Sequence, residues 1–229
     1  MMKSGYISLN DTQMLSYDIE QGRVFKKKHS WDFIDLKWWS RIFEYKFLQK
    51  VVNELNKSNK TLTVLDVATG PFHPGSFILE NGLNNVDALD LLEKPKIFKK
   101  FNKYNINYIK DDMINTKLNK TYDLVVCIST LEHVKKENQK TFLLNMIKLT
   151  KKGGTLILTF DDPGFEELTD IEMYKETLRE NNCLFEELTV EEDKILTNLN
   201  GPIKRDFFKE GFIDKNITIK VYKMFITKA

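Results

Sequence analysis

The chain has 229 residues, 41% of them hydrophobic and 12% aromatic, which is enough for one α/β domain with a sizeable core and a short extension. Its 35 Lys and Arg nearly balance 33 Asp and Glu, and the net charge of +2 argues against a dedicated nucleic-acid-binding protein. The N-terminus lacks an apolar signal region and no apolar run approaches the roughly 18 residues of a membrane span, so we predict a cytosolic protein.

The two cysteines, Cys127 and Cys183, lie in strand-like or pre-strand segments without a C-x-x-C pair or a His/Cys cluster nearby. Cysteines in such a context are usually buried free thiols. We therefore predict a reduced protein without a metal site.

The first predicted element is a helix in an N-terminal extension, residues 1–57. Apolar residues recur at steps of three and four between Ile34 and Leu55, which is the pattern of an amphipathic helix. Arg41 and Glu44 are three positions apart on this helix, so an ion pair within the helix is one interpretation of both residues.

The next stretch predicts a strand, a glycine turn, a helix and a second strand. The apolar run at 62–65 is typical of a strand buried on both faces, and it ends at Asp66. A turn rich in glycine and proline follows, then a helix over 76–80 and a second apolar strand at 86–89. This order is the nucleotide-binding half of a Rossmann-like sheet.

Two residues of this stretch point to a nucleotide-like ligand. Gly70 lies in the turn at the carboxyl end of the first strand, where the missing side chain lets the backbone approach a ligand closely. Asp90 ends the second strand and follows Asp66 at close to the interval of about 20 residues at which an acid meets ribose hydroxyls.

The rest of the chain continues the alternation of helices and strands. We predict helices at about 96–104, 136–149 and 169–180, and strands at 106–109, 122–128, 155–160, 184–190 and 217–227. The pair Gly153 and Gly154 predicts a tight turn that lets the strand at 155–160 begin. Residues 191–217 form an irregular excursion that we interpret as a substrate-specific insert.

Four stretches resemble, in order, the motifs of the class I S-adenosylmethionine-dependent methyltransferases, in a subset acting on small molecules and glycans. They are the SRIFEY segment at 40–45, the VLDVATG segment at 64–70, the strand at 122–128 followed by LEHV, and LTKKGG with the strand after it. The second resembles motif I, with Ala68 in place of its first glycine and Phe72 in place of its third.

The resemblance implies an α/β fold with a Rossmann-like, mostly parallel sheet of seven strands in the order 3-2-1-4-5-7-6. The last strand is antiparallel and helices flank the sheet. The methyltransferase domain would span residues 58–229, preceded by the helical extension or lid. The implied reaction is in-line methyl transfer from S-adenosylmethionine to an oxygen or nitrogen of a small molecule or carbohydrate or secondary-metabolite precursor, with S-adenosylhomocysteine as product.

The resemblance also implies a set of cofactor-binding residues. In the family, the acid after the third strand bonds the adenine amino group and the next residue packs on the ring; Asp112 and Met113 match, with Asp111 a one-residue alternative. Arg41 would pair with the methionine carboxylate, in competition with the intrahelical pair described above. The full implied set is Arg41, Asp66, Ala68, Thr69, Gly70, Asp90, Leu91, Asp112, Met113 and Ser129.

Candidate catalytic residues follow the strand at 122–128. A hydroxyl or protonated-amine acceptor must lose a proton, and His133 is the first candidate base because imidazole titrates near neutrality. A capping role for His133 on the next helix is the alternative. Glu132 and Asp161 are carboxylates that we expect near the mouth of the site, and His73 lies in the motif I turn.

Other functional classes remain as alternatives. The absence of an Asn-Pro-Pro-Tyr/Phe run after the strand at 122–128, and of a Pro-Cys pair, argues against DNA methylation. A nicotinamide-dependent oxidoreductase is disfavoured because no G-x-G-x-x-G is present. The altered motif I keeps open a catalytically inactive, cofactor-binding or regulatory protein with the same fold.

Overall fold

The structure is a computed structural model, and it describes residues 5–6, 39–70, 74–80, 84–94, 104–162, 170–185 and 220–229. The strands are β1 (Gly5–Tyr6), β2 (Thr63–Val67), β3 (Asn85–Asp90), β4 (Ile106–Lys110), β5 (Tyr122–Ile128), β6 (Thr150–Asp162), β7 (Cys183–Phe185) and β8 (Lys220–Lys228). The α-helices are α2 (Trp39–Leu55), α3 (Pro74–Glu80), α4 (Lys136–Leu149) and α5 (Ile171–Glu180), with short 3-10 helices η2 (Asn56–Ser58) and η4 (Leu131–His133).

The strands form one sheet in the order β4-β3-β2-β5-β6-β8, and β7 pairs with the outer edge of β8. The pairs from β4 to β6 are parallel, whereas β8 runs antiparallel to both β6 and β7. This confirms the predicted order 3-2-1-4-5-7-6 with an antiparallel last strand. The two-residue strand β1 also pairs with β8, an addition that the sequence did not suggest.

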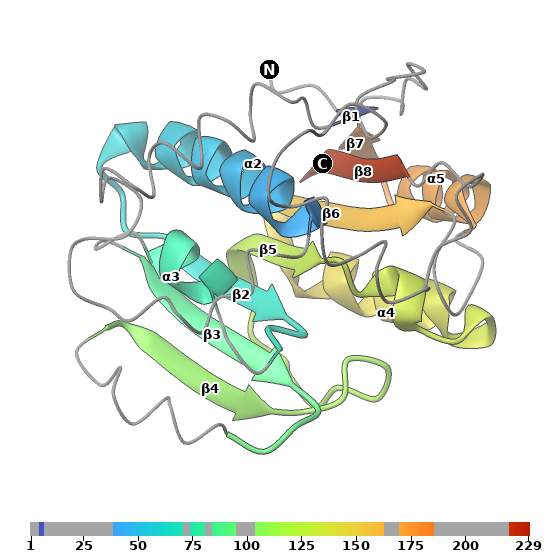
Figure 1. The fold of residues 1–229 in the computed structure, drawn as a ribbon, viewed down its shortest axis with the longest axis horizontal. Helices are drawn as coiled ribbons and strands as arrows, with labels where there is room; N and C mark the ends of the chain where they lie inside the picture. The colour runs from blue at the N-terminus through green and yellow to red at the C-terminus, as the bar shows by residue number, and fades with distance from the viewer. Residues whose placement is uncertain are drawn as a thin grey trace.

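Helices cover both faces of the sheet (Figure 1). Because side chains alternate along a strand, neighbouring residues of the central strands enter different cores. Leu65 and Val125 pack with side chains of α4 and α5, whereas Val64 and Leu124 pack with side chains of α2 and α3. Both faces of the central strands are therefore buried, which explains their continuous apolar runs.

The structure corrects the predicted start of the fifth strand. Strand β6 begins at Thr150, before the glycine pair, and its pairing with β5 shifts register between Tyr122 and Leu124. Gly153 adopts φ +72°, and a Cβ on Gly154 would lie 2.9 Å from the carbonyl oxygen of Lys151. The glycines therefore form an irregularity within the strand, where backbone crowding excludes a side chain.

Several predicted segments lie wholly or partly outside the described residues. They are the helix before Trp39, the helix at about 96–104, strand six beyond Phe185, and the insert at 191–217. Within the described part, β8 begins at Lys220 and ends at Lys228, and α5 begins at Ile171 with the Asp170 carboxylate as its N-terminal cap. The division into residues 1–57 and 58–229 stays a prediction.

The carboxylate of Asp123 joins three strands at the amino end of the sheet. Its Oδ2 accepts hydrogen bonds from the Thr63 N–H at 2.9 Å, the Thr63 hydroxyl at 2.7 Å and the Lys151 ammonium at 3.0 Å. The Lys60 ammonium lies 3.3 Å from Oδ1. Burial works to raise the pKa of Asp123, but these donors outweigh it and hold the pKa well below its ordinary value.

We expect the Asp123→Asn variant to lose about 2 kcal/mol of unfolding free energy at pH 7, because charge-assisted hydrogen bonds to β2 and β6 are weakened. A carboxylate with a lowered folded-state pKa contributes stability above its unfolded pKa and loses it as pH falls toward the folded pKa. Urea unfolding at several pH values measures the difference, which we expect to shrink below about pH 4. A difference that stays constant with pH would contradict this assignment.

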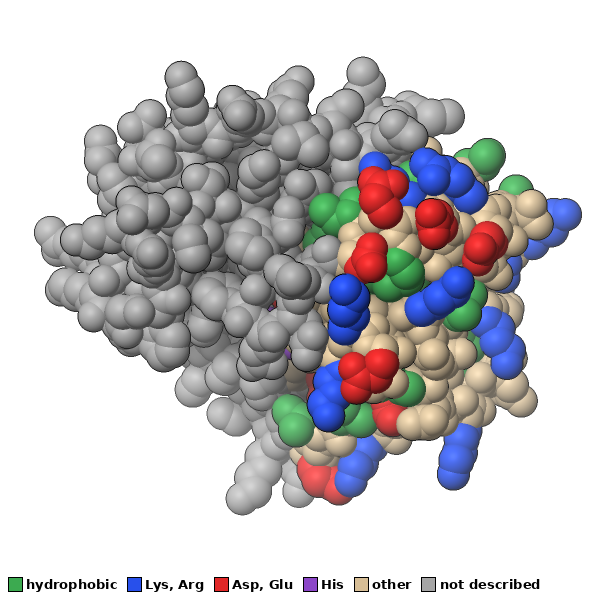
Figure 2. Space-filling view, turned by 90° about the vertical axis from the view of Figure 1, so that its right-hand side faces the viewer, with side chains coloured by type: hydrophobic (Ala, Val, Ile, Leu, Met, Phe, Trp, Pro, Cys, Tyr) green, Lys and Arg blue, Asp and Glu red, His purple; other side chains and the backbone are tan. Residues whose placement is uncertain are grey.

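The described part of the surface carries mixed charge. Figure 2 shows Lys and Arg side chains interspersed with Asp and Glu on the described half of one face. Pairs such as Lys140–Glu180, which joins α4 to α5, and Lys175–Glu172 contribute to this mixture. No helix in the described ranges is both long enough and apolar enough to cross a membrane.

Candidate functional site

The carboxyl ends of β2, β3 and β5 form the edge at which the predicted residues meet. Strand β2 pairs with β3 on one side and with β5 on the other, so the direction of strand succession reverses at β2. Open parallel sheets bind ligands beyond the carboxyl ends of their strands at such a switch point. The residues after these three strands are therefore the candidate site.

Asp66, the penultimate residue of β2, anchors the loop and the helix that follow the strand. Its carboxylate accepts a hydrogen bond from the Ser76 hydroxyl at 2.5 Å, and the Thr69 and Ser76 hydroxyl oxygens lie 2.9 Å apart. A Cβ on Gly75 would lie 3.5 Å from Oδ2 of Asp66, so α3 begins close against the carboxylate. Asp66 thus orders the turn from β2 into α3.

The electrostatics of Asp66 differ from those of a surface carboxylate. Only 3% of the residue is exposed. Burial raises its pKa to about 6, the hydrogen bonds from Ser76 and Thr69 oppose the rise, and the charge of Asp90 adds to it. Asp90 is therefore close enough to Asp66 for its charge to make ionisation of Asp66 less favourable.

Asp90 ends β3, and its carboxylate organises the turns of two neighbouring strands. Oδ2 accepts the Gly70 N–H at 2.8 Å, and Oδ1 accepts the Leu92 N–H at 3.0 Å. Gly70 adopts φ +71°, a conformation that glycine reaches without steric cost. Leu91, directly after Asp90, is 64% exposed and presents apolar surface beside the carboxylate. A polar acceptor and an apolar side chain therefore lie together at this edge.

Two non-glycine residues adopt left-handed backbone conformations at this same edge. Ala68 follows β2 with φ +54°, and Ser129 follows β5 with φ +40°. Such conformations cost about 1–2 kcal/mol for L-residues other than Asn and Asp, and they cluster at functional sites where the surroundings over-determine them. The strain therefore coincides with the switch point of the sheet.

We expect the Ala68→Gly variant to be more stable than the wild type by about 0.5–1 kcal/mol. Glycine removes the strain of the left-handed conformation, and this gain exceeds the stability lost because glycine gives the unfolded chain more conformational entropy. The matched control is Ala88→Gly in the middle of β3, where Ala88 is fully buried and in a regular strand. That control should lose stability. Thermal unfolding of both variants tests the prediction, and a loss of stability in Ala68→Gly would contradict it.

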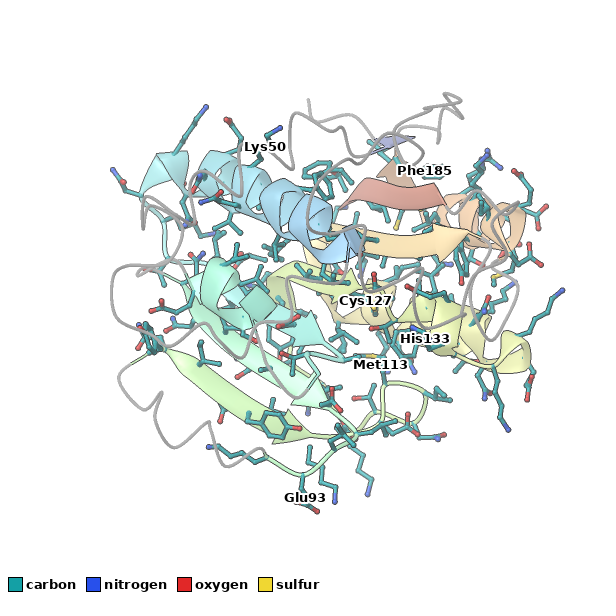
Figure 3. All side chains as sticks on the ribbon, in the orientation of Figure 1. Lys50, Glu93, Met113, Cys127, His133 and Phe185 are labelled. Atoms are coloured by element: carbon teal, nitrogen blue, oxygen red, sulfur yellow. The ribbon has the colours of Figure 1, made fainter. Side chains whose placement is uncertain are left out.

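The carboxylates after β4 hold a turn together. Asp112 accepts the Ile114 N–H and the Asn115 side-chain amide, each at 2.9 Å. Asp111 accepts a hydrogen bond from the Thr116 hydroxyl at 2.7 Å. Burial works to raise the pKa of the Asp111 carboxyl, but its hydrogen bonds outweigh burial and hold the pKa below the ordinary value. Met113, directly after Asp112, is 2% exposed and packs into the core beside α4 (Figure 3).

The two catalytic candidates point into different environments. Both belong to η4, directly after β5, but His133 is exposed whereas Glu132 is fully buried. Burial is the main cause that raises the pKa of the Cys127 thiol and of the Tyr174 hydroxyl, and the charge of Glu132 is the second. Glu132 therefore lies near both groups. The expectation that Glu132 lies at the mouth of the site is therefore wrong; it lies beneath the surface.

Glu44 of α2 was missed as a site residue by the sequence interpretation. The side chain is fully buried, and Oε1 accepts a hydrogen bond from the Thr159 hydroxyl at 2.5 Å and a short one from the Ser129 hydroxyl. It therefore joins the helix before the sheet to the carboxyl ends of β5 and β6. The available signal was Glu44 itself, a charged residue four positions before Leu48 on the buried face of α2.

Three predicted residues lie wholly or partly outside the described part of the structure. Arg41 lies in the first turn of α2 and Asp161 lies near the end of β6, but the side chains of both are outside the described part, as is the whole of His73. Cys127 and Cys183 are buried free thiols, as predicted. Within the described ranges, no group of three His, Cys, Asp or Glu side chains is placed to hold a metal ion.

Comparisons with known proteins all find methyltransferases. A family model described as a methyltransferase domain matches residues 64–154. The ubiquinone biosynthesis O-methyltransferase of Rickettsia canadensis is 31% identical over 156 residues, which cover 64% of this chain and 64% of that protein. The chain thus spans less than two thirds of the length of the curated relatives it matches.

Two solved structures share the fold over nearly the whole of both chains. The magnesium protoporphyrin IX methyltransferase of Synechocystis, with bound S-adenosylmethionine, has a TM-score of 0.58 at 16% identity and covers 97% of this chain and 99% of its own. The 1,6-didemethyltoxoflavin-N1-methyltransferase of Burkholderia thailandensis has a TM-score of 0.55 at 13% identity and covers 100% of both chains. The sheet order and these shared structures show that the chain has the Rossmann-like fold of S-adenosylmethionine-dependent methyltransferases, and residues 64–154 match the methyltransferase-domain family.

Proposed function

We propose that the protein binds S-adenosylmethionine at the carboxyl edge of β2, β3 and β5. The observation that carries the proposal is the Asp90 carboxylate, which ends β3 and already holds the Gly70 and Leu92 N–H groups. A carboxylate has about four acceptor positions, so two more hydrogen bonds, from a vicinal diol, fit its chemistry. Neighbouring Leu91 offers exposed apolar surface for an adenine ring.

The other proposed cofactor contacts follow from the same edge. The loop of Ala68, Thr69 and Gly70 supplies backbone at the switch point, with Asp66 ordering it from below. Asp112 is the proposed acceptor for the adenine amino group, and Met113 supports the turn that holds it. Ser129 is proposed beside the transferring methyl group, and Arg41 beside the methionine carboxylate.

We propose that the reaction is methyl transfer to a hydroxyl oxygen of a small molecule. The bound sulfonium supplies an activated methyl group, and the product is S-adenosylhomocysteine. The support for an oxygen acceptor is that the curated relatives are ubiquinone biosynthesis O-methyltransferases. The protein's part is to hold the acceptor in line with the methyl carbon, which can supply about 7–11 kcal/mol of the barrier.

A hydroxyl acceptor must also lose its proton, and we propose His133 as the group that takes it. His133 is exposed at the carboxyl end of β5, so an acceptor in the site can reach it. Glu132, which is buried behind it, is proposed to tune this end of β5 rather than to contact the acceptor. The extension at 1–57 and the insert at 191–217 are proposed to complete the acceptor site.

Formation of S-adenosylhomocysteine, measured by mass spectrometry, tests this function. The purified chain is incubated with S-adenosylmethionine and a panel of hydroxylated aromatic compounds, amines and sugar nucleotides. We expect product only with hydroxylated small molecules, and less of it from a His133→Gln variant at pH 7. Tight cofactor binding without turnover on any acceptor would instead favour a regulatory protein, and product with amines alone would contradict the oxygen acceptor.

A further inference from the structure

We propose that Glu44 is a positioning residue for the cofactor site, acting through Ser129. This inference rests on the proposed function, because it concerns the same carboxyl edge. The sequence alone allowed only an ion pair within α2, whereas the structure assigns Glu44 a contact with two strand ends. The role proposed is to fix the backbone where β5 leaves the sheet.

The contact is a closed ring of three residues, Glu44 of α2, Ser129 directly after β5 and Thr159 of β6, joined by side-chain and backbone hydrogen bonds. The Ser129 and Thr159 hydroxyls both donate to Oε1 of Glu44, the first through a short hydrogen bond and the second at 2.5 Å. The Ser129 N–H in turn donates to the carbonyl oxygen of Thr159 at 3.0 Å and lies 3.2 Å from its hydroxyl oxygen. Because each member is held by the other two, the ring defines the position of all three.

Burial makes this ring costly unless every bond is made. Glu44 and Thr159 are fully buried, and Ser129 is 6% exposed. A buried carboxylate is stabilised only where hydrogen bonds compensate for its lost hydration, and well-packed apolar residues often give equal or greater stability. A carboxylate at this position therefore fits a role in specifying geometry better than a role in stabilising the fold.

The geometry that it specifies is the strained one. Ser129 adopts φ +40°, which costs free energy unless the surroundings impose it. The residue after the neighbouring strand β2, Ala68, also has a positive φ and lies close in the chain to Asp66. Burial, and then the charge of Glu132, raise the pKa of the Cys127 thiol, and the charges of Asp66 and Glu44 add smaller contributions. These carboxylates therefore lie near the end of β5.

A change in the Glu44 side chain of α2 should therefore alter cofactor binding at the carboxyl ends of the strands. Glu44 lies on the same helical face as Leu48 and Val51, which are fully buried against the sheet. When the carboxylate is removed, Ser129 loses its restraint, although the apolar face of α2 still packs. Cofactor affinity should then fall by more than the loss of folded protein explains.

Calorimetric titration with S-adenosylhomocysteine tests this, at a temperature where each variant remains folded. We expect Glu44→Ala and Ser129→Ala each to weaken binding about tenfold through lost preorganisation, and the double variant to bind no more weakly than either single one. Glu44→Gln keeps an acceptor oxygen and should recover part of the affinity. The matched control is Glu54→Ala on the same helix, where the side chain is 53% exposed and pairs with Lys57.

Each outcome decides the question. Wild-type affinity in Glu44→Ala, or independent losses that multiply in the double variant, would overturn the positioning role. If Glu44→Ala does not fold, Thr159→Val removes one donor of the ring and provides the same comparison with Ser129→Ala. A wild-type chain that does not bind S-adenosylhomocysteine would refute the proposed function itself, whereas binding that is unaffected by all ring variants would refute only this inference.

Discussion

Replacing Asp90 with alanine is expected to weaken the binding of S-adenosylmethionine at least about 100-fold. Two charge-assisted hydrogen bonds to the ribose contribute about 1.5–3 kcal/mol each, and a loss of about 3 kcal/mol corresponds to roughly that factor. The variant also leaves the Gly70 and Leu92 N–H groups without their present acceptor, so the turn itself loses order. Calorimetric titration of the variant beside the wild type measures the loss.

The matched control is Asp87→Ala, three residues earlier on β3. The Asp87 carboxylate accepts the Tyr122 hydroxyl and the Lys120 ammonium, each at 2.8 Å, and it lies about 10 Å from the carboxyl end of the strand. This variant should lose stability yet retain the affinity of the wild type. If both variants lose affinity equally, the loss reports damage to β3, and the ribose contact would be ruled out.

The second large effect is expected in the pH dependence of stability. Burial holds the folded-state pKa of Asp66 at about 6, against an ordinary value of 3.8. The folded protein therefore binds the proton more tightly than the unfolded chain does between these values. Stability should fall as pH rises from about 4 to about 6, by an amount on the order of 3 kcal/mol.

The Asp66→Asn variant isolates this contribution, because asparagine keeps an oxygen that can accept the Ser76 hydroxyl but does not ionise. Urea unfolding from pH 4 to pH 7 should show the variant gaining stability relative to the wild type as pH rises. Asp87→Asn is the control: the hydrogen bonds of Asp87 lower its pKa against the effect of burial, so its difference from the wild type should stay nearly constant from pH 4 to pH 7 and shrink only below about pH 4. An Asp66→Asn difference that does not change with pH would contradict the assignment.

The sheet and much of its ligand edge were accessible from the sequence for a physical reason. Strands buried on both faces require continuous apolar runs, and the acids Asp66 and Asp90 mark where two such runs end. The helix predicted at 136–149 matches α4, Lys136–Leu149, because its apolar face repeats with the helical period. The antiparallel β8 and its position between β6 and β7 followed from the family resemblance rather than from its pattern.

Other features of the site depend on contacts that no local pattern encodes. Glu44 meets its two donors across 85 and 115 residues of sequence, so a glutamate in a helix gave no sign of where its side chain points. The left-handed backbone of Ala68 and Ser129 is imposed by the surrounding fold against local preference. The inward turn of Glu132 likewise depends on η4, a single turn whose rotation sets which side chain is buried.

Calorimetric titration of the wild-type chain with S-adenosylmethionine, S-adenosylhomocysteine and NAD tests the central claim most directly. The switch-point edge around Asp66, Asp90 and Ser129 predicts one site per chain for the first two ligands, and no heat from NAD because the loop lacks the dinucleotide pattern. Binding of NAD, or no binding of either S-adenosyl compound, would contradict the assignment of this edge as the cofactor site.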